Sequence, residues 1–178
     1  MSRPVFGGIN HVSVVTADIE RAVRTWTERY GIGPWRLYRY DASNMHAMCN
    51  GRPAVVPFRA ALAQLSPTTR IEIIQPLDDR GPYAESLARH GGADHIHHVR
   101  FDVADYAAST AALGQDLGLG TIMTAEFDGA PGSPSKFDCT YFDARADLGF
   151  VVEIGRAGAG FAMPEPEAVY PAESPAKR

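Results

Sequence analysis

Two histidines and two glutamates, one of each in either half of this chain of 178 residues, have the types needed to bind one metal ion: His11, Glu72, His98 and Glu153. Two imidazoles and two carboxylates suit a single divalent ion of Zn, Ni, Co, Mn or Fe and leave positions for water or a substrate. Each glutamate lies between apolar residues of a strand-like segment. Because strand side chains alternate between two faces, each acid should point away from its apolar neighbours.

The two halves of the chain also repeat each other in sequence. One offset aligns His11 with His98 and Asp18 with Asp105. His97 is a rival to His98, but a shift by one residue would turn the imidazole to the other face of the strand. A duplicated unit that twice offers a histidine and a glutamate predicts one four-ligand site on a pseudo-two-fold axis.

Hydrophobic periodicity predicts the order β-α-β-β-β in both halves. In the first half, Asp18 is a plausible N-cap of a helix over 18–30, and Gly31 a plausible stop. Residues 41–53 contain Asn, Gly, Pro and Met, and we expect them to form a loop over the site. The expected strands cover residues 11–16, 35–40, 55–65, 70–75, 98–103, 121–126, 137–143 and 150–154, and the second helix covers 105–117.

These elements divide the chain into a domain over residues 1–156 and an irregular tail over 157–178. Within the domain, module one covers about 8–77 and module two about 95–156. The tail is rich in Gly, Ala, Pro and Glu, which is typical of irregular structure. The sequence leaves open whether the two modules pair within one chain or across two.

Bulk composition excludes several classes of protein. The net charge is −4 and the basic residues are scattered, which argues against nucleic-acid binding. No apolar stretch is long enough to span a bilayer, and the N-terminus lacks the apolar run of a signal peptide. Cys49 and Cys139 are far apart and not in a metal-binding or redox spacing. We therefore expect a cytoplasmic protein whose partner is a small-molecule substrate.

Three stretches together resemble a known superfamily: residues 9–12, residues 71–99 with Glu72 and His98, and residues 141–153. They resemble the vicinal oxygen chelate superfamily, which includes glyoxalase I, methylmalonyl-CoA epimerase, extradiol dioxygenases and bleomycin-resistance proteins. The resemblance is closest to the epimerase-like and glyoxalase-like branch. It implies an α+β fold in which two tandem βαβββ modules form an open, cup-shaped, eight-stranded mixed sheet around a metal. It also implies a homodimer, and by position the same four ligands.

The resemblance implies a metal-dependent isomerase, epimerase or lyase that acts next to a carbonyl group. A divalent ion acidifies the neighbouring C–H, and Glu153 or Glu72 would take the proton. One departure concerns the acyl-CoA epimerases, whose additional acidic base would fall near Val55, where this chain has no acid. Four aromatic residues could line a pocket for a bulky or aromatic substrate or could simply pack in the core: Trp35, Tyr38, Tyr40 and Phe58.

Two other functions stay open. An Fe(II)-dependent ring-cleaving dioxygenase would use two histidines and one carboxylate, and Glu72 as a fourth ligand argues against it. A non-catalytic protein could sequester a hydrophobic compound, as bleomycin-resistance proteins do, but those usually lack the ligands that this chain retains. Oxygen uptake would identify the first alternative, and metal content would separate the second from an enzyme.

Overall fold

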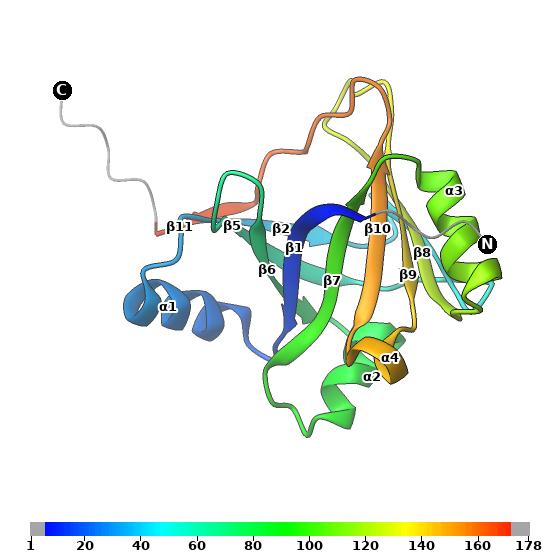
Figure 1. Cartoon of the computed structure of the whole chain (residues 1–178). Coiled ribbons are helices and arrows are strands. Elements are labelled where there is room, and N and C mark those ends of the chain that lie inside the picture. The colour runs from blue at the N-terminus through cyan, green and yellow to red at the C-terminus, as the bar shows by residue number, and fades with distance from the viewer. Residues whose placement is uncertain (1–5, 172–178) are drawn as a thin grey trace.

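Two central strands, β1 (Phe6–Val15) and β7 (His95–Val103), pair antiparallel and join the halves of the chain into one mixed sheet (Figure 1). This computed structural model describes residues 6–171. Outwards from β1 the order is β6, β5, β2, and outwards from β7 it is β10, β9, β8. These flanking strands are β2 (Trp35–Tyr40), β5 (Phe58–Gln64), β6 (Arg70–Pro76), β8 (Thr121–Phe127), β9 (Phe137–Phe142) and β10 (Val151–Ala157). The two halves therefore pair within one chain.

The sheet has eleven strands over residues 6–171, not the expected eight. Two of the additional strands, β3 (Met45–Cys49) and β4 (Arg52–Ala54), form a hairpin where the sequence was expected to form a loop. Asn50 and Gly51 form its turn with φ of 50° and 75°. An Asn-Gly pair is a strong signal for such a two-residue turn, because both residues tolerate positive φ. The hairpin extends the far edge of the sheet by pairing β3 with β8.

The third additional strand, β11 (Ala168–Tyr170), lies in the segment that was expected to be irregular. It pairs antiparallel with β2, so the chain returns from β10 to the opposite edge of the sheet (Figure 1). The backbone N–H of Glu167 donates to the carbonyl of Leu37 at 2.8 Å just before this strand. Residues 172–178 of the predicted tail lie outside the described residues.

Within residues 6–171, four helical segments accompany the sheet: α1 (Ile19–Tyr30), α2 (Gly81–Arg89), α3 (Tyr106–Ala111), which continues as a π-helical turn over Ala112–Asp116, and α4 (Arg145–Leu148). The buried side of α1 carries Ile19, Ala22 and Val23, which pack with Ile71 and Ile73 of β6. Within residues 6–171, no helix has both the length and the apolar character required to cross a membrane.

Strand alternation gives the sheet two different faces. Ile71 and Ile73 of β6 lie in the core beneath α1, whereas Ile74 belongs to the separate core on the opposite, concave face. The same alternation in β10 places Val152 and Ile154 in a third core with Leu113. The residue between each apolar pair is the glutamate of that strand, so both acids face the concave side.

Removing the cap of α1 should destabilise the protein. Asp18 Oδ1 accepts a hydrogen bond from the backbone N–H of Arg21 at 2.9 Å, which satisfies one of the free N–H groups of the first turn. We expect D18A to lower the free energy of unfolding by about 1 kcal/mol in urea denaturation. D18N keeps an oxygen acceptor and is the matched control. Equal loss in both variants would contradict a capping role.

Candidate metal centre

The register of β6, β1, β7 and β10 arranges the candidate ligands in two rows across the concave face. The first row consists of Arg70, His11, Arg100 and Glu153, and the second row consists of Glu72, Ser13, His98 and Val151. Each row runs across all four strands, one residue from each. The four predicted ligands therefore come from four adjacent strands and meet at the middle of the sheet.

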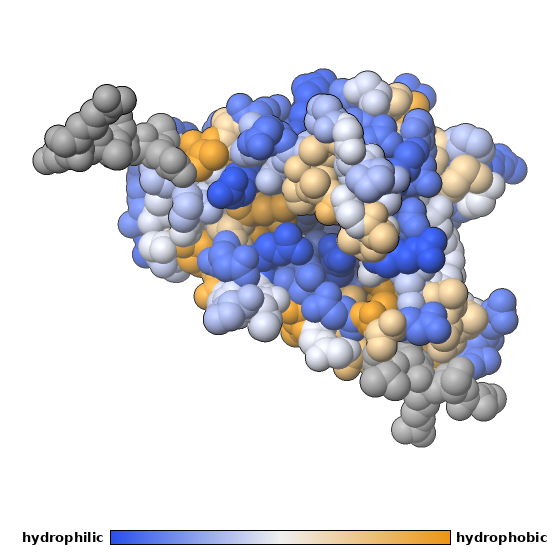
Figure 2. Space-filling model, turned by 90° about the horizontal axis from the view of Figure 1, so that it is seen from above, coloured by the Kyte–Doolittle hydropathy of each residue, from blue (hydrophilic) through white to orange (hydrophobic). Residues whose placement is uncertain are grey.

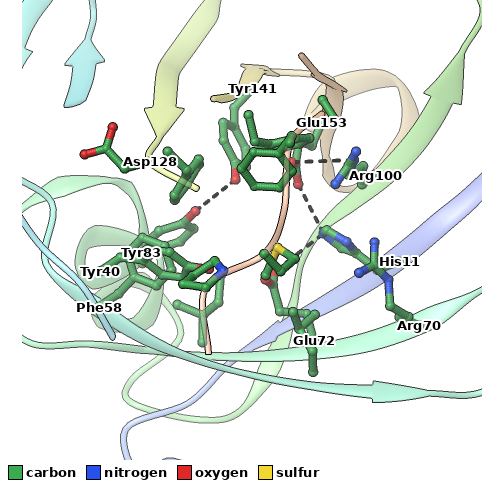
Figure 3. A pocket seen from close by; sticks show the side chains of 18 residues that line it. His11, Tyr40, Phe58, Arg70, Glu72, Tyr83, Arg100, Asp128, Tyr141 and Glu153 are labelled. Atoms are coloured by element: carbon green, nitrogen blue, oxygen red, sulfur yellow. Dashed lines mark hydrogen bonds and ion pairs between the residues drawn. The ribbon is translucent and has the colours of Figure 1, made fainter. Parts of the chain in front are cut away.

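The donor atoms of the predicted ligands lie close together, and Figure 3 shows three of these ligands, His11, Glu72 and Glu153. The Nε2 atoms of His11 and His98 are 3.2 Å apart, and Glu153 Oε2 lies 3.1 and 3.0 Å from them. Glu72 Oε2 lies 3.5 and 3.4 Å from the same two nitrogen atoms. Ligands bound at about 2.1 Å in tetrahedral or octahedral geometry are separated by about 3.0–3.4 Å. The spacing of His11, His98 and Glu153, whose donor atoms all lie within 4.8 Å of one another, therefore fits a divalent ion, and Glu72 lies farther out beside them.

The burial of these four polar side chains costs free energy unless a metal ion or a proton balances their charges. His98 is 0% exposed, Glu153 2% and His11 5%, whereas the Glu72 side chain is 13% exposed. Among the described residues, Nδ1 of His11 is buried and has no hydrogen-bond partner. Two carboxylates and two imidazoles are seldom buried together unless they share protons or a metal ion.

Without a metal ion, protonation of His98 offsets part of the negative charge of the two carboxylates. Burial disfavours a charged His98, but hydrogen bonds with Glu153 and Glu72 outweigh it and raise its pKa to about 9. Burial likewise opposes ionisation of Glu153, yet the charge of His11 and hydrogen bonds with both imidazoles hold its pKa well below the usual value. The pKa of Glu72 is lowered by the same imidazoles against the effect of burial. His98 therefore carries a proton at neutral pH.

Metal binding should become stronger as the pH rises. The raised pKa of His98 means that protonation stabilises the metal-free protein fully below pH 6.5 and that this contribution is lost as the pH rises through about 9. A ligating imidazole must give up this proton. We expect zinc affinity to increase about tenfold per pH unit between pH 6.5 and 8.5, with one proton released per ion. Calorimetric titrations in buffers of different ionisation enthalpy measure both quantities, and pH-independent binding without proton release would contradict the prediction.

His97 lies beside His98 rather than on the opposite face. The pairing of β1 with β7 shifts between Ser13, opposite His98, and Val14, opposite Ile96, so His97 is the extra residue of a β-bulge. Its Nδ1 lies 3.0 Å from Nδ1 of His98. Burial and the charge of His98 hold the pKa of His97 well below its usual value, so this ring is neutral. We assign His97 Nδ1 as the acceptor and His98 Nδ1–H as the donor, which directs Nε2 of His98 to the cluster.

A cavity of about 220 Å³ opens beside the cluster. Its wall includes aromatic and apolar side chains from both halves and from the segment after β10: Tyr40, Phe58, Leu62, Ile74, Tyr83, Phe127, Phe137, Tyr141, Phe161, Met163 and Pro164. The molecule seen from above is hollowed near its centre, with hydrophilic and hydrophobic residues around the hollow (Figure 2). The cavity is therefore mostly apolar, with the candidate ligands on one side.

The four aromatic residues that the sequence offered for this pocket divide into two groups. Tyr40 and Phe58 line the cavity. Tyr38 packs in the core of the concave face, and Trp35 is fully buried beneath α1, where its indole N–H donates to the carbonyl of Ile32 at 2.8 Å. Trp35 and Tyr38 therefore have packing roles.

Sequence reasoning missed several polar residues of the cavity, among them two arginines and two tyrosines. Arg70 is two positions before Glu72, and Arg100 is two positions after His98, so the period of a strand could have placed both on the ligand face. Tyr83 comes from α2 and donates a hydrogen bond to the hydroxyl of Tyr141 at 3.2 Å. Burial raises the pKa of both phenols well above the usual value, so both hydroxyls stay protonated. No local pattern in the sequence links these two tyrosines.

Solved structures with the same fold have low sequence identity to this chain. A methylmalonyl-CoA epimerase from Mycobacterium tuberculosis has 17% identity and a TM-score of 0.57, and the match covers 87% of this chain and 91% of that chain. A variant of the Streptomyces coelicolor methylmalonyl-CoA epimerase, in complex with 2-nitronate-propionyl-CoA, has 17% identity and a TM-score of 0.59, with 87% and 100% covered. A hypothetical protein from Bacillus halodurans has 16% identity and a TM-score of 0.56, with 83% and 91% covered. At such identity the likeness shows the fold alone.

No curated protein matches the chain. Residues 10–133, more than half of the sequence, match the family described as Glyoxalase/Bleomycin resistance protein/Dioxygenase superfamily. This range contains three of the four candidate ligands, His11, Glu72 and His98, and Glu153 follows it. The chain therefore belongs to the glyoxalase/bleomycin resistance protein/dioxygenase superfamily.

Proposed function

We propose that this chain is a divalent-metal-dependent enzyme that moves a proton at the carbon next to a carbonyl group, as an isomerase, an epimerase or a lyase. The observation that carries the proposal is the convergence of four donor atoms beside an aromatic cavity. The proposed ligands are His11, Glu72, His98 and Glu153, held by two βαβββ modules. When bound, the ion supplies a Lewis acid that polarises a carbonyl oxygen. A homodimer and a cytoplasmic location stay predictions.

Glu72 is the better candidate for the base. Its carboxylate lies farther from both imidazoles than that of Glu153, and its side chain is 13% exposed against 3%. A carboxylate that is held less tightly can turn toward a substrate carbon and accept its proton. Glu153, which is closer to both histidines and more deeply buried, is better suited to stay in place as a ligand.

The structural neighbours named as methylmalonyl-CoA epimerases support proton transfer next to a carbonyl. We do not extend the proposal to methylmalonyl-CoA, because the segment around Val55 lacks the acid that the acyl-CoA epimerases carry there. The cavity wall favours a substrate with a bulky or aromatic body, since Tyr40, Phe58 and Phe127 line it and their rings pack against one another.

The proposal is tested by metal content and by solvent exchange. We expect about one transition-metal ion per chain after incubation with Zn, Ni, Co, Mn or Fe(II) salts. Carbonyl compounds incubated with the loaded protein in deuterated water should exchange the hydrogen at the neighbouring carbon, as followed by proton NMR. A protein that binds none of the five ions would contradict the proposal.

One observation favours a second candidate function. His11, His98 and Glu153 form a group of three in which one donor atom of each residue lies within 4.8 Å of the others. Two histidines and one carboxylate form the facial site of non-haem Fe(II) oxygenases. Oxygen uptake by the Fe(II)-loaded protein with catechols would support a dioxygenase. Exchange without oxygen consumption would support the isomerase, epimerase or lyase.

A further inference from the structure

The two rows of residues that cross the concave face differ mainly in charge, because only the first row contains arginines. The pseudo-two-fold axis relates His11 to His98 and Glu153 to Glu72, but it relates Arg100 to Ser13 and Arg70 to Val151. The cavity is lined by both arginines, whereas Ser13 and Val151 are buried below it. A metal site needs only the symmetric part of this arrangement. The two arginines are therefore the asymmetric part of the site.

Arg100 has an unused donor at the edge of the site. Its side chain is 14% exposed, and its Nε is buried and forms no hydrogen bond within the part of the chain that the structure describes. The guanidinium lies over the ring of Phe137, 4.4 Å from the centroid, and Nε is 3.9 Å from Glu153 Oε1. Stacking on a ring fixes the plane of the guanidinium and leaves its edge free to bind a planar anion.

Arg70 has a neutral partner, Oδ1 of Asn10, to which its Nη2 donates at 2.5 Å. A divalent ion would balance the charges of Glu72 and Glu153. The remaining acid of the wall, Asp128, forms an ion pair with Lys136 at 3.2 Å, and Lys136 also pairs with Glu126 at 2.5 Å. The charges of Arg70 and Arg100 would then have no counter-ion on the wall of the loaded site. An uncompensated positive charge in a partly buried pocket favours an anionic ligand.

Figure 3 shows how this charge is placed: Arg70 and Arg100 flank His11, and Tyr40, Phe58 and Tyr83 lie across the cavity. We propose that the substrate is an aryl-substituted carboxylic acid with a carbonyl group, whose carboxylate binds Arg100 and Arg70 while its aromatic end fills the opposite side. Arginine suits this role because its donors match the two oxygens of a carboxylate. The inference rests on the proposed function and names its substrate class.

Calorimetry with two matched probes tests the proposal. The acid is 4-oxo-4-phenylbutanoate, and its primary amide is the neutral analogue with the same carbonyl and phenyl groups. We expect the zinc-loaded wild type to bind the acid at least about tenfold more tightly than the amide. R100Q and R70Q should each reduce this ratio toward one without weakening the amide, and R100K should retain part of it. R24Q, which removes the same charge from the exposed side of α1, should leave the ratio unchanged.

Two results would overturn the carboxylate site. One is a ratio that persists in both R100Q and R70Q, and the other is no binding of the acid to wild type at millimolar concentration. Metal content and solvent exchange are measured independently of this ratio, so the two proposals can fail separately. A zinc-loaded wild type that exchanges protons but does not bind the acid would reject the anion site and retain the enzyme.

Discussion

Replacing His98 with alanine is expected to weaken zinc binding by about 100-fold or more. His98 is 0% exposed, and its Nε2 lies within 3.4 Å of oxygen atoms of both Glu72 and Glu153, so its loss removes a donor from the centre of the cluster. Replacing a group that only orients a ligand already costs about 10–100-fold in metal affinity, and loss of the ligand itself should cost more. Competition with a chromophoric chelator measures the affinity directly.

Thermal stability gives a second measurement of zinc binding, because metal binding and folding are thermodynamically linked. An ion that binds only the folded protein stabilises it by about 2.7 kcal/mol at a concentration of 100 times its Kd. Zinc should therefore raise the Tm of wild type, and this rise should be lost in H98A and in E153A. H46A is the matched control, because His46 is an exposed histidine of β3 that does not line the cavity. Full zinc-dependent stabilisation of H98A would show that the ion binds elsewhere.

Much of this site could be predicted because strand alternation is a local property. The side chains of Ile71 and Ile73 can both be buried in the core beneath α1 only if Glu72, which lies between them, points to the other face of the sheet. The same holds for Glu153 between Val152 and Ile154. The repeat then selects one histidine and one glutamate in each half. Sequence alone cannot show that their donor atoms meet, since this depends on the pairing of β1 with β7.

The features that were missed depend on longer-range or less regular structure. The hairpin β3–β4 had a local signal, Asn50-Gly51, but its pairing with β8 joins segments that are far apart in the chain. The pairing of β11 is also long-range, since these three residues of the tail form a strand only because β2 is an open edge of the sheet. The bulge at His97 breaks the period of two on which the choice between His97 and His98 depended. Hydrophobic periodicity therefore does not predict long-range strand pairing or β-bulges.

Replacing Glu72 with glutamine should separate chemistry from metal binding. The amide cannot accept a proton from carbon, and general-base catalysis contributes about 10²–10⁴-fold, so solvent exchange at the carbon next to the carbonyl should slow by that factor. The ion should still bind through His11, His98 and Glu153, whose donor atoms lie within 4.8 Å of one another. Proton NMR in deuterated water, at zinc concentrations that saturate the variant, measures the exchange rate without contribution from lost metal.

E153Q is the matched control for E72Q. Glu153 Oε2 lies 3.1 and 3.0 Å from the two imidazole nitrogens, closer than Glu72, so E153Q should lose metal and exchange together. If E153Q instead keeps its metal and loses exchange while E72Q remains active, Glu153 is the base and Glu72 the ligand. If both variants retain metal and wild-type exchange, neither glutamate takes the proton. The two carboxylates are equivalent by sequence position, so only their unequal burial and distances predict which of them reacts.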